Sequence, residues 1–111
     1  MSAATPPNGD PTCDKDGYLI DLNDWSRDVA HHLAATEDVV LSDTHWQVID
    51  LLRDFFDRTE TSPPMRPLVK LVREHLGEEC GSSVYLMGLF GGSPAKTAAK
   101  IAGLPRPTNC L

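Results

Sequence analysis

The residue with the clearest chemical potential is Cys110, a lone thiol one position before the C-terminal Leu111. Pro105 and Pro107 precede it, and prolines at alternate positions stop a helix and favour an extended arm. An extended arm beginning at Leu104 would carry the thiol roughly 20 to 25 Å from its anchor, at about 3.3 Å per residue. Because a structural cysteine is normally buried, a thiol in this position is predicted to reach into another protein.

The other thiols and imidazoles do not have the spacing of a metal or catalytic site. Three cysteines at wide spacing fit neither a disulfide framework nor a zinc site. Cys13 is expected in an unstructured tail, and Cys80 directly follows two glutamates that make it a poor nucleophile. His31 and His32 are neighbours on one helix and point about 100° apart, while His45 is expected at the surface. We therefore predict no bound metal and, without a phosphate-binding glycine loop, no cofactor.

Charge is unevenly distributed along the chain. The net charge is −6, yet residues 1–64 carry 13 acidic and 4 basic side chains, and residues 65–111 carry 3 acidic and 6 basic ones. The acidic total argues against autonomous binding to nucleic acid. The last 19 residues contain three basic side chains and no acidic one, namely Lys96, Lys100 and Arg106. Their positive charge favours a nearby thiolate or persulfide anion, so they are predicted to support Cys110.

The hydrophobic pattern predicts a mostly α fold, a compact bundle of about five helices. Serine, proline and glycine mark the helix ends, because they supply N-caps, first-turn residues and C-terminal stops. The expected helices cover about 24–35, 43–58, 65–76, 83–90 and 94–102. A broad apolar stripe containing Trp46, Ile49, Leu52 and Phe56 makes the second helix the central, mostly buried one. The turn at Asp16-Gly17 predicts a small N-terminal β-hairpin.

These elements form one domain with two loose ends. Residues 1–13 are expected to be a disordered tail, 14–103 a helical domain, and 104–111 a mobile arm that carries the active cysteine. No apolar run approaches the length of about 18 residues that a membrane span requires. The first ten residues lack the basic and hydrophobic regions of a secretory signal. We therefore expect a cytoplasmic protein.

The C-terminal sequence resembles that of a known family. Residues 96–111, KTAAKIAGLPRPTNCL, are similar to the end of TusE/DsrC proteins, which finish in KIAGLP(K/R)PTGC followed by one residue. Further similar segments are Gly17-Tyr18-Leu19, Asp24-Trp25, Thr44-His45-Trp46 and Gly91-Gly92-Ser93-Pro94-Ala95-Lys96. The resemblance covers about 14–111. It implies a small helical fold and a mobile arm whose penultimate cysteine, here Cys110, carries sulfur as a persulfide.

Two departures from the family pattern bear on the chemistry. The family divides according to whether a second cysteine lies eleven residues before the penultimate one. In this chain that position is Ala99. The resemblance therefore favours a one-cysteine, TusE-like relay over the members that join two cysteines through sulfur. Asn109 stands where the family usually has glycine, and asparagine tolerates positive φ better than most residues.

The resemblance implies a sulfurtransferase that acts as a sulfur carrier. Cys110 would accept a persulfide sulfur from a donor complex of small TusBCD/DsrEFH-like proteins and pass it to the enzyme that 2-thiolates the wobble uridine of tRNA. One alternative is a DsrC-like protein of dissimilatory sulfur oxidation or sulfite reduction, with sulfite reductase as acceptor. Another is a non-catalytic interaction module or helix-turn-helix regulator, against which the acidic residues Asp54, Asp57 and Glu60 argue.

Overall fold

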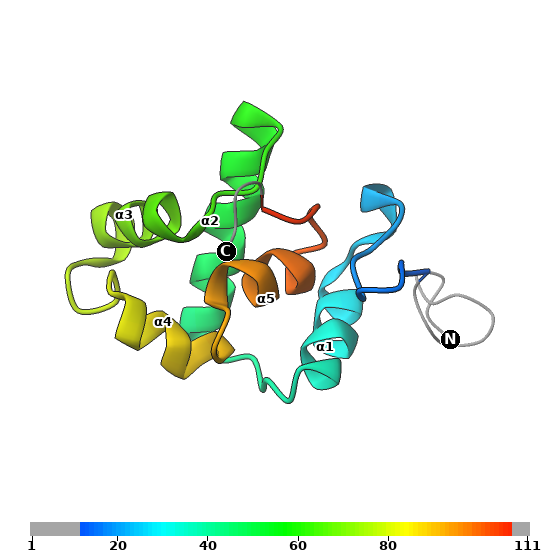
Figure 1. The fold of residues 1–111 in the computed structure, drawn as a ribbon, viewed down its shortest axis with the longest axis horizontal. Helices are drawn as coiled ribbons and strands as arrows, with labels where there is room; N and C mark the ends of the chain where they lie inside the picture. Colours follow the sequence, from blue (N-terminus) through cyan, green and yellow to red (C-terminus); the bar gives the residue numbers. More distant parts are fainter. Residues whose placement is uncertain (1–11, 108–111) are drawn as a thin grey trace.

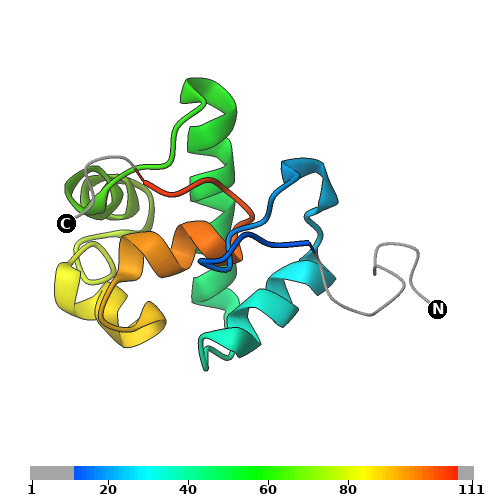
Figure 2. The ribbon, with the colours of Figure 1, turned by 45° about the vertical axis from the view of Figure 1, so that its right-hand side comes forward.

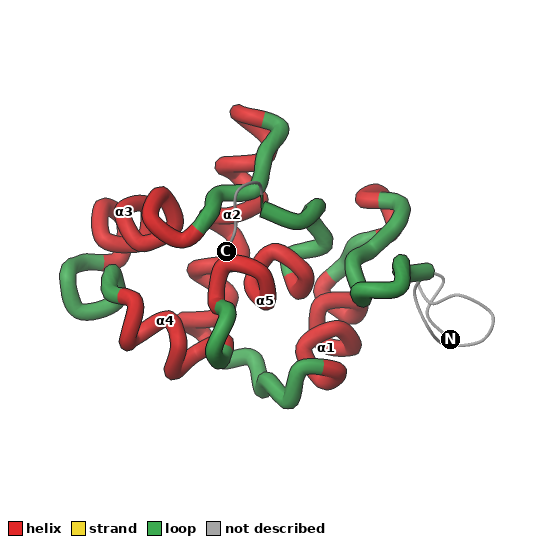
Figure 3. Tube along the Cα trace, viewed as in Figure 1, coloured by secondary structure: helices red, strands yellow, loops and turns green. Residues whose placement is uncertain are grey.

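Five α-helices make up most of the computed structural model, which describes residues 12–107 (Figures 1 and 3). They are preceded by a short 3-10 helix, η1. The elements are η1 (Leu22–Asp24), α1 (Arg27–Thr36), α2 (Asp43–Thr59), α3 (Met65–Leu76), α4 (Ser83–Phe90) and α5 (Pro94–Ile101). The predicted mostly α, five-helix fold is confirmed. No helix within residues 12–107 is long and apolar enough to cross a bilayer.

Local capping sets where most helices begin. Ser26, Ser42 and Ser82 each accept a hydrogen bond from a backbone N–H three residues further on, which satisfies a free donor of the first turn. The first α-helix therefore begins at Arg27, three residues later than expected. Trp25 lies outside it, between η1 and α1, and is free to pack elsewhere.

The predicted β-hairpin is reduced to one isolated antiparallel bridge, between Cys13 and Leu19. The turn between them is held by the Asp14 carboxylate, which accepts hydrogen bonds from the backbone N–H groups of Asp16 and Tyr18. Leu19 is buried and Cys13 packs against the core. Cys13 therefore belongs to the folded domain and not to a loose tail, and the domain includes it.

The centre of the bundle is α5, which contacts each of the other four α-helices (Figures 1 and 2). Its small side chains allow this close approach: Ala98 and Ala99 are fully buried, and Ala95 is nearly so. The second helix, α2, contributes Val48, Ile49 and Leu52, all without exposed surface.

The stripe predicted on α2 is wider than the arc that the bundle buries. Trp46 and Phe56 lie at the margin and are only half-buried. Trp46 instead covers the flank of α1, where the Arg27 guanidinium carbon lies 3.8 Å from the indole centroid and the His31 ring stands edge-on to it. Neighbouring positions of α2 therefore differ in burial, since some pack in the core and others lie at the surface.

Candidate functional site

The first four residues of the C-terminal arm, residues 104–107, are packed against the domain. Leu104 is 2% exposed, and its N–H donates to the Ala99 carbonyl across 2.9 Å. The Ser62 hydroxyl donates to the Pro105 carbonyl across 2.6 Å, and Pro107 is buried. We expected a mobile arm from Leu104 onward. In the structure residues 104–107 lie against the domain, because an extended segment that cannot form a helix still finds hydrogen-bond donors and apolar contacts there. The mobility of the arm stays a prediction.

The junction between α5 and the arm is closed by two side chains from distant parts of the chain. The indole N–H of Trp25 donates to the Ile101 carbonyl across 2.9 Å, and Arg53 donates to the Ala102 carbonyl across 2.5 Å. The Arg53 guanidinium carbon also lies 3.9 Å from the Trp25 ring centroid. The last carbonyls of a helix have no partner within it, so these bonds fix the end of α5 and the starting direction of the arm.

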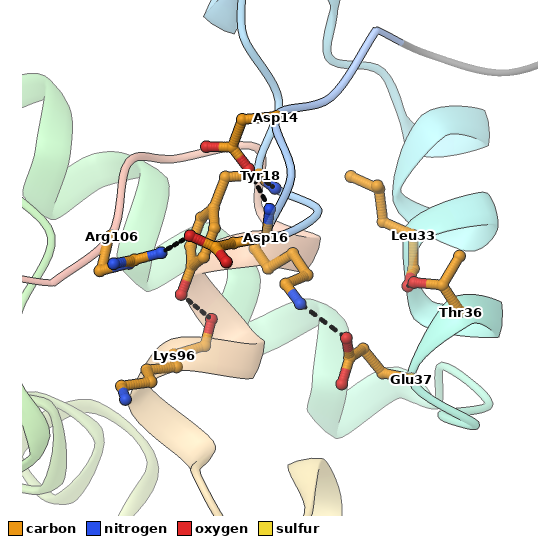
Figure 4. A network of polar contacts seen from close by, with 9 residues as sticks. Asp14, Asp16, Tyr18, Leu33, Thr36, Glu37, Lys96 and Arg106 are labelled. Carbon is orange, nitrogen blue, oxygen red and sulfur yellow. Dashed lines mark hydrogen bonds and ion pairs between the residues drawn. The ribbon is translucent and has the colours of Figure 1, made fainter. Parts of the chain in front are cut away.

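Arg106 anchors the arm to the N-terminal turn (Figure 4). Its guanidinium forms an ion pair with the Asp16 carboxylate and lies 5.4 Å from the Tyr18 ring centroid. The hydrogen bond and then the charge of Asp16 raise the pKa of Arg106 above its ordinary value. Both side chains are about half exposed, so the pair contributes little to folding stability and acts mainly on the position of the arm.

Lys100 is also engaged in an ion pair with a carboxylate. Its ammonium lies 2.7 Å from a carboxylate oxygen of Glu37 at the end of α1, and 5.4 Å from the Tyr18 ring centroid. The Tyr18 hydroxyl donates to the Lys96 carbonyl across 3.4 Å. The N-terminal turn, α1, α5 and the arm therefore meet around Tyr18.

The three predicted supporting residues, Lys96, Lys100 and Arg106, do come together and line one cleft of about 510 Å³. Two of them already face a carboxylate. Cys110 itself lies outside the described residues, so its distance from the cleft is not part of the structure. Sequence reasoning missed the other residues of the cleft, which are Lys15, Asp16, Tyr18, Glu37, Ser93 and Thr97. The turn signal at Asp16-Gly17 marked one segment, but nothing local indicated that it meets α5.

The structure corrects the expected place of His45. It is 7% exposed, its Nδ1 accepts the N–H of Ser42 across 3.0 Å, and its Nε2–H donates to the Leu89 carbonyl across 2.7 Å. Its ring also stands edge-on to Phe90. This histidine closes a capping box and joins α2 to α4, because an imidazole has two nitrogens that can bind both elements at once.

Cys80 has the surroundings of a structural residue. Cys80 is half-buried and packs against the core. Within residues 12–107, no three histidine, cysteine, aspartate or glutamate side chains lie close enough together to hold a metal ion.

Comparison with known proteins agrees with this architecture. The sequence profile of a family described as DsrC like protein matches residues 8–111, and the chain therefore belongs to that family. A sulfurtransferase TusE homolog of Haemophilus influenzae is 49% identical over 98 residues, which cover 88% of this chain and 90% of that protein. The sulfurtransferase TusE of Sodalis glossinidius is 50% identical over 98 residues, with 88% and 91% covered.

Solved structures of the family share the fold. The NMR structure of Allochromatium vinosum DsrC superposes with a TM-score of 0.81 at 42% identity, covering 89% of this chain and 88% of that one. The crystal structure of the oxidized gamma-subunit of dissimilatory sulfite reductase (DsrC) from Archaeoglobus fulgidus gives a TM-score of 0.78 at 38% identity. It covers 91% of this chain and 92% of that one.

Proposed function

We propose that this protein is a sulfur carrier, a sulfurtransferase that holds sulfur as a persulfide on Cys110. The observation that carries the proposal is the family match, which runs through residue 111 and so includes the penultimate cysteine. Relatives named sulfurtransferase TusE, matched over 88% of the chain, support the same class of activity. The folded domain then positions the arm where partner proteins reach it.

The transfer needs one thiolate and no external oxidant. The Cys110 thiolate attacks the terminal sulfur of a donor persulfide, R–S–SH, and the donor sulfur leaves as the thiolate R–S⁻. A new S–S bond forms at Cys110 as the donor S–S bond breaks, so the number of S–S bonds and of electrons is conserved. An acceptor thiolate then attacks the terminal sulfur on Cys110 in the same manner, and Cys110 leaves as a thiolate.

The anchoring of the arm limits how far this sulfur travels. Cys110 follows buried Pro107 by three positions, so chain length keeps its Cα within about 10 Å of that of Pro107. This is well below the reach expected for an arm loose from Leu104. Donor and acceptor must therefore approach the face of the domain where the arm passes Ser62, unless residues 104–107 detach first.

We favour a TusBCD/DsrEFH-like protein complex as donor and the enzyme that 2-thiolates the wobble uridine of tRNA as acceptor. Ala99 supports the one-cysteine relay, because it offers no second thiol to trap sulfur within the chain. The Ala99 side chain is also fully buried, so it forms part of the packed core. Sulfite reductase is the alternative acceptor. The similarity to DsrC structures, at 38% to 42% identity, supports this alternative.

The direct experiment is mass spectrometry after incubation with a persulfide donor such as glutathione persulfide. The Cys110 peptide should gain one sulfur, about 32 Da, and Cys110→Ser should abolish the gain. The matched variants Cys13→Ser and Cys80→Ser should retain it. Full sulfur acceptance by Cys110→Ser would overturn the proposal.

The acceptor is then identified with the loaded protein. Sulfur from persulfide-loaded wild type should appear as 2-thiouridine when the tRNA-thiolating enzyme and tRNA are supplied. Transfer to a sulfite reductase alone, with no thiouridine formed, would instead support the DsrC-like alternative.

A further inference from the structure

The cleft beside Tyr18 has features of a ligand site that sulfur transfer does not use. Its volume is about 510 Å³, enough for a small molecule, and its walls come from the N-terminal turn, the end of α1, α5 and the arm (Figure 4). The site is therefore assembled by segments that are as much as ninety residues apart, as the pair of Asp16 and Arg106 illustrates.

The charge of the cleft selects an anion. Four basic side chains line it, against the two carboxylates of Asp16 and Glu37, in a chain whose net charge is −6. The carboxylates are already paired with Arg106 and Lys100. Lys15 and Lys96 make no ion pair with any residue in the described part of the chain, and they leave the cleft with excess positive charge. A concave site with such an excess concentrates anions.

The first turn of α5 adds hydrogen-bond donors to this charge. Ser93 is the N-cap residue and lines the cleft, but within the described chain its side chain accepts no hydrogen bond from the helix. Pro94 follows at the first helical position. The positive end of the helix dipole and the serine hydroxyl thus face the same side as Lys96.

Thr97 adds a second hydroxyl to the wall of the cleft. Its side chain lines the cleft and the residue is only 8% exposed. Its hydroxyl forms no hydrogen bond with any group of residues 12–107 and keeps some solvent-accessible surface, since every fully buried side-chain polar atom in these residues has a partner. A hydroxyl at the wall of a basic cleft is satisfied when it donates to an acceptor oxygen within that cleft.

We propose that this cleft binds a tetrahedral oxyanion of the phosphate or sulfate class, held by Lys96, Ser93 and Thr97. Lys15 supplies further positive charge from the N-terminal turn. Such an anion presents several acceptor oxygens in different directions, which matches hydroxyl and ammonium donors that come from one helix turn and a facing loop. The ligand chemistry has two sources, a free oxyanion or a phosphate within a nucleotide chain. Because Arg106 lines the same cleft, the bound anion lies beside the anchored root of the arm.

The test is an NMR titration of the full chain with sodium phosphate and sodium sulfate at constant ionic strength, with chloride as the reference salt. We expect saturable shifts of the backbone amides of Ser93, Lys96 and Thr97. Lys96→Met and Thr97→Val should each weaken the apparent affinity about tenfold, the effect of losing one charge-assisted or buried hydrogen bond. Thr97→Ser should restore most of the affinity, which a purely structural role of the threonine methyl would not.

The matched control is Lys70→Met, because Lys70 lines a different cleft together with Asp54, Arg58, Glu74 and His75. It should leave the affinity unchanged. A short oligoribonucleotide distinguishes the sources: shifts of the same amides at lower concentration assign a nucleic-acid phosphate, and shifts with the inorganic salts alone assign a free oxyanion. Shifts that never saturate, or that Lys96→Met and Lys70→Met alter equally, would overturn the proposal.

Discussion

Replacing Gly103 with alanine probes the packing of the junction between α5 and the arm. Gly103 has φ +73°, in the left-handed region that favours glycine. A Cβ built there would lie 2.2 Å from Cδ1 and 2.7 Å from Cγ of the Trp25 indole. The indole cannot move away freely, because it is bonded to the Ile101 carbonyl and lies against Arg53.

The expected destabilisation is the sum of two effects. A left-handed backbone costs alanine about 1 kcal/mol, and forcing one extra carbon into a filled space costs roughly 1 to 3 kcal/mol. We therefore expect the Gly103→Ala variant to lose about 2 to 4 kcal/mol of unfolding free energy. Domains of this size have a total of roughly 5 to 15 kcal/mol, so the variant would be close to unfolding.

Urea denaturation followed by circular dichroism and tryptophan fluorescence measures this loss. The midpoint should fall while the slope with urea stays unchanged. Gly92→Ala is the control, because it lies on the surface with no atom within 4 Å of its added Cβ, and it should shift stability by less than about 0.5 kcal/mol. Equal midpoints for the two variants would refute the description of the junction.

Three further perturbations address the core and the arm. Leu52→Ala should cost about 2 to 5 kcal/mol in the same assay, because this side chain has no exposed surface and its loss leaves a cavity. Deleting residues 104–111 should lower the denaturation midpoint further than deleting only 108–111, because buried Leu104 is lost, and both deletions should remove sulfur acceptance; equal midpoints would contradict the anchored arm. Asp16→Asn should leave the midpoint nearly unchanged, because the pair with Arg106 is half exposed, but increase the mobility of the arm root in NMR relaxation; unchanged relaxation would show that the pair does not hold the arm.

Much of this protein's secondary structure could be predicted from its sequence, because it depends on interactions between residues that are close in the chain. The five helices were predicted to within a few residues, because caps and stops act over only three or four positions. Ser42, for example, accepts the N–H of His45 three residues away. The apolar pattern indicated the side of α2 that faces the core, although α5 and not α2 lies at the centre of the bundle. The KIAGLP-like ending predicted the family that the profile match confirms. That ending also singled out Cys110, whose role stays a prediction.

Only the tertiary structure decided which distant residues meet. Trp25 reaches the Ile101 carbonyl across 76 positions, and Ser62 reaches the Pro105 carbonyl across 43. Prolines in a terminal segment predict an extended backbone but not whether a partner surface exists for it, so the anchoring of residues 104–107 escaped prediction. The burial of His45 and the basic cleft were missed for the same physical reason. Both depend on how helices and turns pack against one another, which the order of residues within a single element does not specify.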